Sequence, residues 1–245
     1  MSASMSENLL TLEGVHTHIG AYHILHGVDL AVPRGQLTML LGRNGAGKTT
    51  TLRTIMGLWP ASQGRITFAG EDITALHTPQ IAQKNIAYVP ENMGIFADLT
   101  VKENMLLAAR SAKSASQMDE QRLQWIFGLF PAVQKFWNHP AGKLSGGQKQ
   151  MLAVSRAIVE PRDLLIVDEP SKGLAPAIIQ NMIDAFQQLK ASGVTILLVE
   201  QNINFARQLG DTVVVMDNGR VVHAGTMQAL AEDEALQQSL LGLAL

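Results

Sequence analysis

The feature that most constrains this chain is a glycine-rich segment, Gly42 to Thr49, that follows an apolar run and precedes a helical pattern. It reads G-R-N-G-A-G-K-T and fits the pattern G-x-x-x-x-G-K-T. Glycines let the backbone turn its N–H groups inward, and the N-terminus of the following helix adds its positive dipole end. The segment therefore predicts a phosphate-binding loop between a strand over Leu37–Leu41 and a helix over Thr49–Met56.

The residues of this loop have different expected roles. The amine of Lys48 is expected to reach the β- and γ-phosphates of a nucleotide, and the hydroxyl of Thr49 is expected to ligate Mg²⁺. The alternative is a plain glycine-rich turn, which the strand–loop–helix context disfavours. The residues expected to contact the nucleotide here are Gly42, Arg43, Asn44, Gly45, Ala46, Gly47, Lys48, Thr49 and Thr50.

A pair of carboxylates, Asp168 and Glu169, ends the apolar run that begins at Leu164. In proteins with such a phosphate loop the aspartate holds Mg²⁺, and the next carboxylate is able to accept a proton from the attacking water. Because side chains alternate along a strand, the two carboxylates are expected to point to different sides and to differ in role. The alternative is a strand end with a helix cap before Pro170, which the upstream loop disfavours.

Hydrophobic periodicity predicts an α/β fold. Apolar runs over 164–167 and 194–199 flank a helical pattern over 176–191, which indicates a βαβ unit whose parallel strands are covered on both faces. The aromatic-rich segment 101–137 is helical in period and poor in strand signals, so it predicts a helical insert.

Two antiparallel parts are expected outside that core. Near the N-terminus, strands over 9–12 and 15–19 flank Glu13–Gly14, which predicts a hairpin turn. Near the C-terminus, Asp217–Arg220 separates two further strands and is a strong hairpin signal. Residues 1–8 are expected to form a loose leader, without the basic and apolar regions of an export signal.

Composition excludes several classes of function. The formal net charge is −2, so the basic footprint of a nucleic-acid-binding protein is absent. The chain has no cysteine, which excludes disulfides, thiol catalysis and Cys-ligated zinc and favours a reducing compartment. No apolar run approaches the ~20 residues that a membrane-spanning helix needs. Charged residues are only 16%, which indicates that a partner covers some of the surface.

A third motif, Leu144–Gln148, precedes a helix expected to run to about Glu160, before Pro161. The serine of this motif is a good N-cap, and the free N–H groups of the helix start form a second anion site. One chain does not easily wrap both anion sites around one nucleotide, whereas two chains arranged head to tail do so reciprocally. A plain capped helix start is the alternative. The residues expected to reach a nucleotide on a second chain are Ser145, Gly146, Gly147 and Gln148.

Three motifs, taken in their order along the chain, resemble those of the ATP-binding subunit of an ABC transporter: Gly42–Thr49, Leu144–Gln148 and Leu164–Glu169. The resemblance implies a P-loop fold of ABC type with a mixed sheet core and an antiparallel N-terminal β part. It also implies a single ATPase domain over 9–241, with a helical subdomain at about 97–160 inserted between the phosphate loop and the strand at 164–169. ATP and Mg²⁺ are the implied cofactors, and an ATP-driven dimer is the implied working state.

Finer motifs at Tyr88–Asn92, Asp168–Pro176 and Leu198–Asn202 resemble the second ATPase subunit of branched-chain amino-acid importers. This implies a peripheral subunit on the cytoplasmic face of a prokaryotic inner membrane, working with a second ATPase subunit of the same or another chain. Two membrane permease subunits and an external solute-binding protein complete the implied complex. In such complexes the segment here numbered Glu91–Leu99 receives a short permease helix. The alternatives are a urea or short-amide importer and a soluble non-transport ABC ATPase.

The resemblance also assigns reaction roles, some of them on substituted residues. Glu169 corresponds to the catalytic base. Glu91 stands where most relatives have a Gln that contacts Mg²⁺, and Gln201 stands where most have a His that touches the γ-phosphate. Ile19 occupies the position of the aromatic that stacks on adenine, and Tyr22 is the alternative stacking residue.

Overall fold

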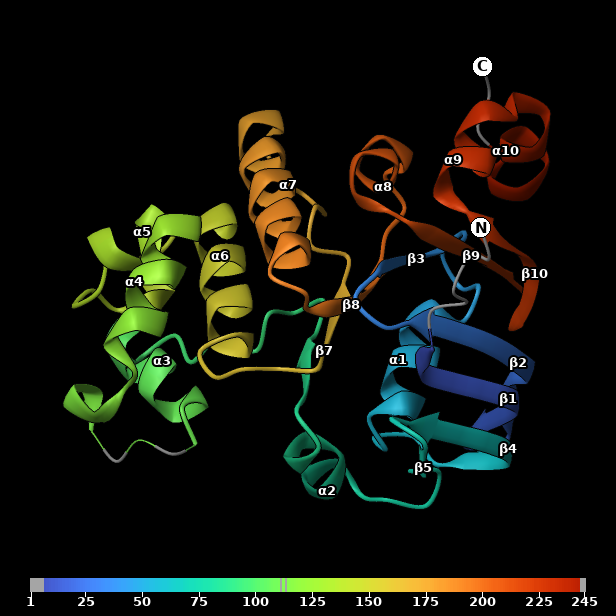
Figure 1. The fold of residues 1–245 in the computed structure, drawn as a ribbon, viewed down its shortest axis with the longest axis horizontal. Helices are drawn as coiled ribbons and strands as arrows, with labels where there is room; N and C mark the ends of the chain where they lie inside the picture. Colours follow the sequence, from blue (N-terminus) through green and yellow to red (C-terminus); the bar gives the residue numbers. More distant parts are fainter. Residues whose placement is uncertain (1–6, 111, 113, 243–245) are drawn as a thin grey trace.

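The computed structural model describes residues 7–110, 112 and 114–242, and Figure 1 shows an antiparallel sheet on one side of a mixed sheet. The predicted leader falls mostly outside the described residues. The antiparallel sheet has the strand order β2–β1–β4–β5. Its strands are β1 (Asn8–Ile19), β2 (Tyr22–Pro33), β4 (Ala61–Phe68) and β5 (Glu71–Asp72).

The mixed sheet has the order β10–β9–β3–β8–β7–β6, and all its neighbours are parallel except β9 and β10. Every residue of β3, β7 and β8 is buried, as expected for strands covered on both faces. The strands are β3 (Leu37–Leu41), β6 (Ile86–Val89), β7 (Leu164–Asp168), β8 (Thr195–Val199), β9 (Thr212–Asp217) and β10 (Arg220–Thr226).

Helix α1 joins the two sheets through one core, in which Leu52 and Ile55 pack between side chains of both sheets. The opposite face of the mixed sheet shares a second core with α6, α7 and α8. Figure 1 shows α3, α4, α5 and α6 grouped at the end of the molecule away from the antiparallel sheet. The helices are α1 (Lys48–Ile55), α2 (Thr78–Gln83), α3 (Val101–Ala108), α4 (Glu120–Leu129), α5 (Pro131–Lys135), α6 (Gly146–Ala157), α7 (Pro176–Ala191), α8 (Ile203–Leu209), α9 (Met227–Glu232) and α10 (Glu234–Leu241).

The predicted N-terminal hairpin at Glu13–Gly14 is wrong, because β1 runs through this dipeptide as one strand. A shift of register at this point leaves Gly14 in a bulge with φ +55°, and its N–H donates to Oδ1 of Asp29 at 2.7 Å. The chain turns instead at Gly20, with Ile19 opposite Tyr22. Gly14, which lies between two apolar segments of the sequence, therefore marks a bulge within one strand rather than a turn between two strands.

Two other local predictions had different outcomes. The hairpin at the C-terminal side is confirmed, with Asn218 at φ 45° and Gly219 at φ 73° between β9 and β10. Helix α6 ends at Ala157, three residues before the expected end, because Pro161 lacks the N–H that the Ala157 carbonyl would need for another turn. Arginine side chains bind the carbonyl groups left free at this end. Arg162 Nε donates to the Ala157 carbonyl at 3.1 Å, and Arg122 Nε donates to the Ile158 carbonyl at 2.8 Å. In the described parts of the chain, every helix is too short or too polar to cross a bilayer.

Candidate functional site

Four loops meet at one edge of the mixed sheet, because β3, β8, β7 and β6 are parallel neighbours and their carboxyl ends point the same way. The glycine-rich loop follows β3, and the Asp168–Glu169 pair stands at the end of β7. Gln201 follows β8, and Glu91 follows β6. This edge is where ligands bind in open α/β sheets, and it collects the residues that the sequence predicted.

The glycine-rich loop has the backbone that a phosphate cradle needs. Gly42, Gly45 and Gly47 have φ values of 148°, 82° and 102°, a region that only glycine adopts readily. A Cβ at Gly42 would lie 2.3 Å from the carbonyl oxygen of Met216, so this position also lacks room for a side chain. In the fully described first turn of α1, Gly47 provides no side-chain cap and there is no acidic residue, so the helix N-terminus offers N–H groups and an uncompensated positive dipole end.

Lys48 is buried beneath this loop. Its Nζ donates to the carbonyl oxygens of Gly42 at 2.8 Å and Arg43 at 3.1 Å, and it lies 3.8 Å from Oε1 of Glu169. Burial lowers the pKa of Lys48, whereas the negative charge of Glu169 opposes this shift. The amine is therefore a buried cation at the mouth of the cradle, where an anionic ligand would find a strong partner.

Asp168 and Thr49 form an oxygen pair beside the cradle. The Thr49 hydroxyl donates to Oδ1 of Asp168 at 3.3 Å, and the Tyr88 hydroxyl donates to Oδ2 at 3.5 Å. Burial raises the pKa of the Asp168 carboxyl to about 6, an effect opposed by Thr49 and reinforced by the nearby charge of Glu169. Carboxylate and hydroxyl oxygens in this arrangement fit a hard divalent cation such as Mg²⁺.

Glu169 is held in a strained backbone conformation, with φ 50°, and only 9% of it is exposed. One carboxylate oxygen accepts a hydrogen bond from the Gln201 amide at 2.5 Å, and the other lies 3.3 Å from Nζ of Lys172. The same Gln201 amide donates to Oδ1 of Asn44 at 2.8 Å. Gln201 thus links the carboxylate after β7 to the phosphate loop after β3.

Two residues of this site were missed by sequence reasoning. Lys172 binds Glu91 at 2.5 Å as well as Glu169, so the Glu91 carboxylate faces an ammonium group in this structure. Glu200 is 2% exposed and accepts hydrogen bonds from the loops after β7 and β8. A charged residue directly after a long apolar strand is the sequence signal that marks Glu200. Lys172 has a weaker signal, its spacing of three residues from Glu169.

A cavity of about 320 Å³ lies over the cradle. Some of the described residues that were predicted to bind a nucleotide do not line this cavity: Gly42, Arg43, Ala46, Tyr22 and Ser145–Gln148. The side chain of Tyr22 is 76% exposed. The lining residues are Ile24, Asn44, Gly45, Gly47, Lys48, Thr49, Thr50, Glu91, Glu169 and Lys172.

The capped segment, Ser145–Gln148, starts α6 as predicted. The Ser145 hydroxyl accepts from the Gln148 backbone at 3.3 Å, and the Gln148 side chain accepts from the Ser145 backbone at 2.9 Å. A Cβ at Gly147 would lie 2.7 Å from Cγ2 of Ile178, whereas a Cβ at Gly146 would meet nothing within 4 Å. The glycine at 147 is therefore explained by packing inside the chain, and the glycine at 146 is not.

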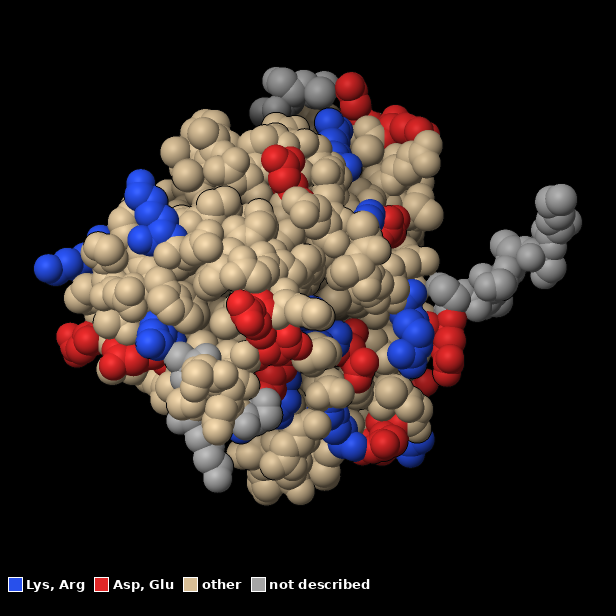
Figure 2. Space-filling model, turned by 60° about the vertical axis from the view of Figure 1, so that its left-hand side comes forward, with Lys and Arg blue, Asp and Glu red and all other residues tan. Residues whose placement is uncertain are grey.

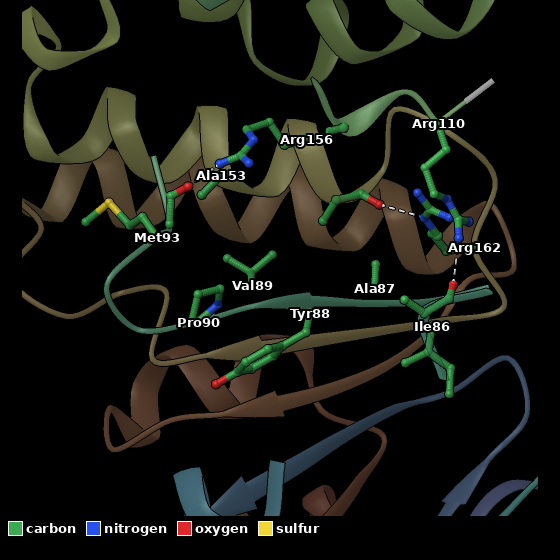
Figure 3. A pocket seen from close by; sticks show the side chains of 14 residues that line it. Ile86, Ala87, Tyr88, Val89, Pro90, Met93, Arg110, Ala153, Arg156 and Arg162 are labelled. Atoms are coloured by element: carbon green, nitrogen blue, oxygen red, sulfur yellow. Dashed lines mark hydrogen bonds between the residues drawn. The ribbon is translucent and has the colours of Figure 1, made fainter. Parts of the chain in front are cut away.

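A second cavity, the arginine pocket, lies between β6 and α6 and has a volume of about 250 Å³ (Figure 3). Its floor is apolar and includes Ala87 and Val89, Met93 lies at one side, and Arg110, Arg156 and Arg162 stand around it (Figure 3). Met93 and Gly94 bring the predicted docking segment into its wall.

Comparisons with known proteins agree with this geometry. The profile of the family described as "ABC transporter" matches residues 25–172. The high-affinity branched-chain amino acid transport ATP-binding protein BraG of Pseudomonas aeruginosa is 39% identical over 96% of this chain and all of its own length. The probable branched-chain amino acid transport ATP-binding protein LivF of Archaeoglobus fulgidus is 35% identical over 90% of this chain and 93% of its own.

Solved structures show the same fold. The ADP conformation of an ATP-binding cassette from an ABC transporter has a TM-score of 0.80 at 25% identity, covering 97% of this chain and all of that one. The ATP-binding subunit of another ABC transporter has a TM-score of 0.79 at 28% identity, covering 96% of each chain. The predicted α/β architecture, with an antiparallel part and a mixed core, is therefore confirmed.

Proposed function

Because this chain belongs to the ABC transporter family and is an ATP-hydrolysing ATP-binding subunit, we propose that it drives the uptake of branched-chain or other small amino acids. The observation that carries the proposal is similarity to BraG over the full length of that protein. The described residues form a nucleotide cradle, and the proposal assigns the solute path to other subunits. Uptake of urea or a short amide is the alternative cargo.

Each site residue takes a separate part in hydrolysis. Lys48 and the N–H groups of Gly45 and Gly47 hold the β- and γ-phosphates, as the cradle geometry supports. Glu169 accepts the proton of the attacking water, because it is the buried carboxylate nearest the Lys48 amine. Gln201 donates a hydrogen bond to the γ-phosphate or to Glu169, which its present bond to Glu169 supports.

Thr49 and Asp168 would hold Mg²⁺, since their oxygens are adjacent and Asp168 is buried without a cationic partner within ion-pair distance among the described residues. When bound, the ion neutralises charge that develops on the phosphates. Glu91 would join this shell on leaving Lys172, the residue that it binds in this structure. An oxygen ligand remains available at this position, although it carries a charge that a glutamine lacks.

ATP closes two ATPase subunits head to tail, with the capped segment of each completing the site of the other. The open space at Gly146 supports this, because packing inside the described chain does not explain the glycine, whereas the close approach of a second chain would. The capped segment also stands away from the cradle of its own chain, whose cavity it does not line in the described residues. The partner is a second copy or a related ATPase chain.

The arginine pocket is the proposed seat for a cytoplasmic helix of a permease subunit. Its apolar floor and arginine rim suit an amphipathic helix, and Met93 connects it to the segment that begins with Glu91 (Figure 3). A broad area free of Lys, Arg, Asp and Glu lies on the face shown in Figure 2, as expected of a surface that other subunits cover. The proposal also includes two permeases, an external solute-binding protein and a place on the cytoplasmic face of the membrane, as the resemblance to importer subunits implies.

Uptake in cells tests the proposal. A strain lacking this gene should lose accumulation of radiolabelled leucine, and the wild-type gene should restore it. Lys48→Ala is the matched control, because it should remove ATP binding and leave uptake abolished even when the protein is expressed normally. Loss of labelled urea uptake with normal leucine uptake would identify the alternative cargo, and no change for either solute would refute uptake of leucine and of urea by this subunit.

A further inference from the structure

Glu200 is a buried carboxylate at the junction of two loops that carry catalytic groups. It follows the last residue of β8, and 2% of it is exposed. Its backbone N–H donates to the carbonyl of Leu40 at 3.3 Å, which holds it at the edge where β3 and β8 end. It does not line the cavity over the cradle, and loop N–H groups occupy both of its carboxylate oxygens, so it is assigned no nucleotide contact.

The two oxygens of Glu200 bind different loops. Oε1 accepts from the backbone N–H of Ser171 at 2.9 Å, in the loop after β7. Oε2 accepts from the backbone N–H groups of Gln201 at 3.0 Å and Asn202 at 3.2 Å, in the loop after β8. Burial raises the pKa of Glu200, and hydrogen bonds from the side chain and backbone of Ser171 oppose the rise. A carboxylate with two acceptor oxygens is required to hold both loops at once.

These loops carry the groups that meet at the site. Ser171 is two residues after Glu169, whose backbone is held at φ 50°. Gln201 is the residue directly after Glu200, and its side chain reaches the carboxylate of Glu169. A residue in such a sparsely populated conformation persists only where its surroundings fix it, and the bond to Ser171 is one such restraint.

We propose that Glu200 is a positioning residue for ATP hydrolysis, which clamps the loops after β7 and β8 so that Glu169 and Gln201 converge. The inference rests on the proposed roles of those two residues. Glu200 itself touches neither the nucleotide nor the attacking water. Its loss should therefore lower the rate of the chemical step and leave ATP binding nearly unchanged.

Glu200→Gln is the direct test. The amide keeps the shape of the side chain, but it has one acceptor oxygen, and its NH₂ group must face an N–H donor in one of the two loops. We expect kcat for ATP to fall at least tenfold, with the ATP dissociation constant changed less than threefold. Glu200→Asp is the second variant. It keeps the charge and can still bind the N–H groups of Gln201 and Asn202, but it is too short to reach Ser171, so kcat should fall similarly.

Val199→Ala is the matched control for stability, because it opens a small cavity at the same strand end and keeps the carboxylate. If Val199→Ala lowers the melting temperature as much as the Glu200 variants do, it should still keep kcat within twofold of wild type. The proposal is overturned if Glu200→Gln or, where that variant does not fold, Glu200→Asp keeps kcat within twofold. It is also overturned if Val199→Ala lowers kcat as much, or if ATP affinity falls more than kcat.

Glu169→Gln, measured in parallel, separates this inference from the proposed function. Normal turnover in Glu169→Gln would remove the assigned base and with it the basis of the inference. Loss of turnover in Glu169→Gln together with normal turnover in the folded Glu200 variants would refute the clamp alone.

Discussion

The side-chain amide of Gln201 donates to the carboxylate of Glu169, although the two residues are 32 positions apart and follow different strands. The contact orients the candidate base, because it fixes one carboxylate oxygen and leaves the other toward Lys172. A glutamine at this position cannot carry charge, so the pair orients the carboxylate without adding a proton to the site. Proton transfer from the attacking water at this edge of the mixed sheet should therefore depend mainly on Glu169.

Glu169→Gln should retain ATP binding and lose hydrolysis. The amide keeps the shape of the carboxylate, but it accepts the proton of the attacking water poorly, so turnover should fall by ~10²-fold or more. Steady-state phosphate release and equilibrium ATP binding check the two halves of this prediction. ATP-bound dimers of the variant should also persist longer in size-exclusion chromatography. ATPase activity close to that of wild type would remove Glu169 from the role of base.

Asp168→Asn should stabilise the protein in the absence of nucleotide and Mg²⁺ at neutral pH. The folded-state pKa of Asp168 is raised from 3.8 to about 6, so the folded protein binds more protons than the unfolded chain between these values. Its stability therefore falls as the pH rises through this window, by up to about 3 kcal/mol for such a shift. The neutral amide removes that loss, and melting curves should show a higher melting temperature for the variant at pH 7.5.

The pH dependence of the stability gain in Asp168→Asn provides a control. At pH 3.5 the Asp168 carboxyl is protonated in the folded state and largely protonated in the unfolded state, so the difference between variant and wild type should nearly vanish. Asp163→Asn, at an exposed position directly before the same strand, should change stability by no more than ~0.5 kcal/mol at either pH. A variant less stable than wild type at pH 7.5 would contradict the burial argument.

Gly146→Asp should block ATP-driven dimerisation without unfolding the chain or weakening ATP binding by the monomer. The new side chain has room within its own chain, and an acidic residue in the first turn of a helix is favourable. Across a dimer it would place negative charge against the γ-phosphate. Sedimentation with ATP and Glu169→Gln as the hydrolysis-deficient background measures the effect. Loss of ATP binding by the dilute monomer would contradict the head-to-tail arrangement.

Gly147→Ala serves as the contrasting variant. Its Cβ would lie 2.7 Å from Ile178, so it should destabilise the monomer itself, by roughly 1–3 kcal/mol. Ile178→Ala in the same chain should relieve the clash and recover part of that loss. The two adjacent glycines thus separate an effect between chains from an effect within one chain.

Local patterns predicted much of this fold, and contacts distant in sequence set the rest. Leu37–Leu41 is apolar except for Thr38, as expected for a strand with both faces buried, so its pattern is visible without the structure. The bulge at Gly14 was misread because the same glycine suits a turn or a bulge, and the choice depends on pairing with β2.

The candidate site divides in the same way. The phosphate loop and the Asp168–Glu169 pair are contiguous motifs, whose chemistry is written in consecutive residues. The pairing of Lys172 with Glu91 spans 81 positions and appears only when β6 and β7 lie side by side. Glu200 lies inside the motif at Leu198–Asn202, but the sequence does not reveal its contacts, because its partners are backbone N–H groups that every residue except proline possesses.

GTP should compete with ATP within about tenfold, a gap of ~1.4 kcal/mol. Base–aromatic stacking supplies ~1–3 kcal/mol, and the position expected to supply it holds Ile19. Tyr22 lies opposite Ile19 across the turn, is 76% exposed and does not line the cavity. Affinity should then rest on phosphate contacts, which do not distinguish the bases, and Tyr22→Ala should leave ATP affinity unchanged in calorimetric titrations. If wild type rejects GTP by a hundredfold, or ~2.7 kcal/mol, and Tyr22→Ala erases that preference, the tyrosine stacks on the base and the assignment of Ile19 is wrong.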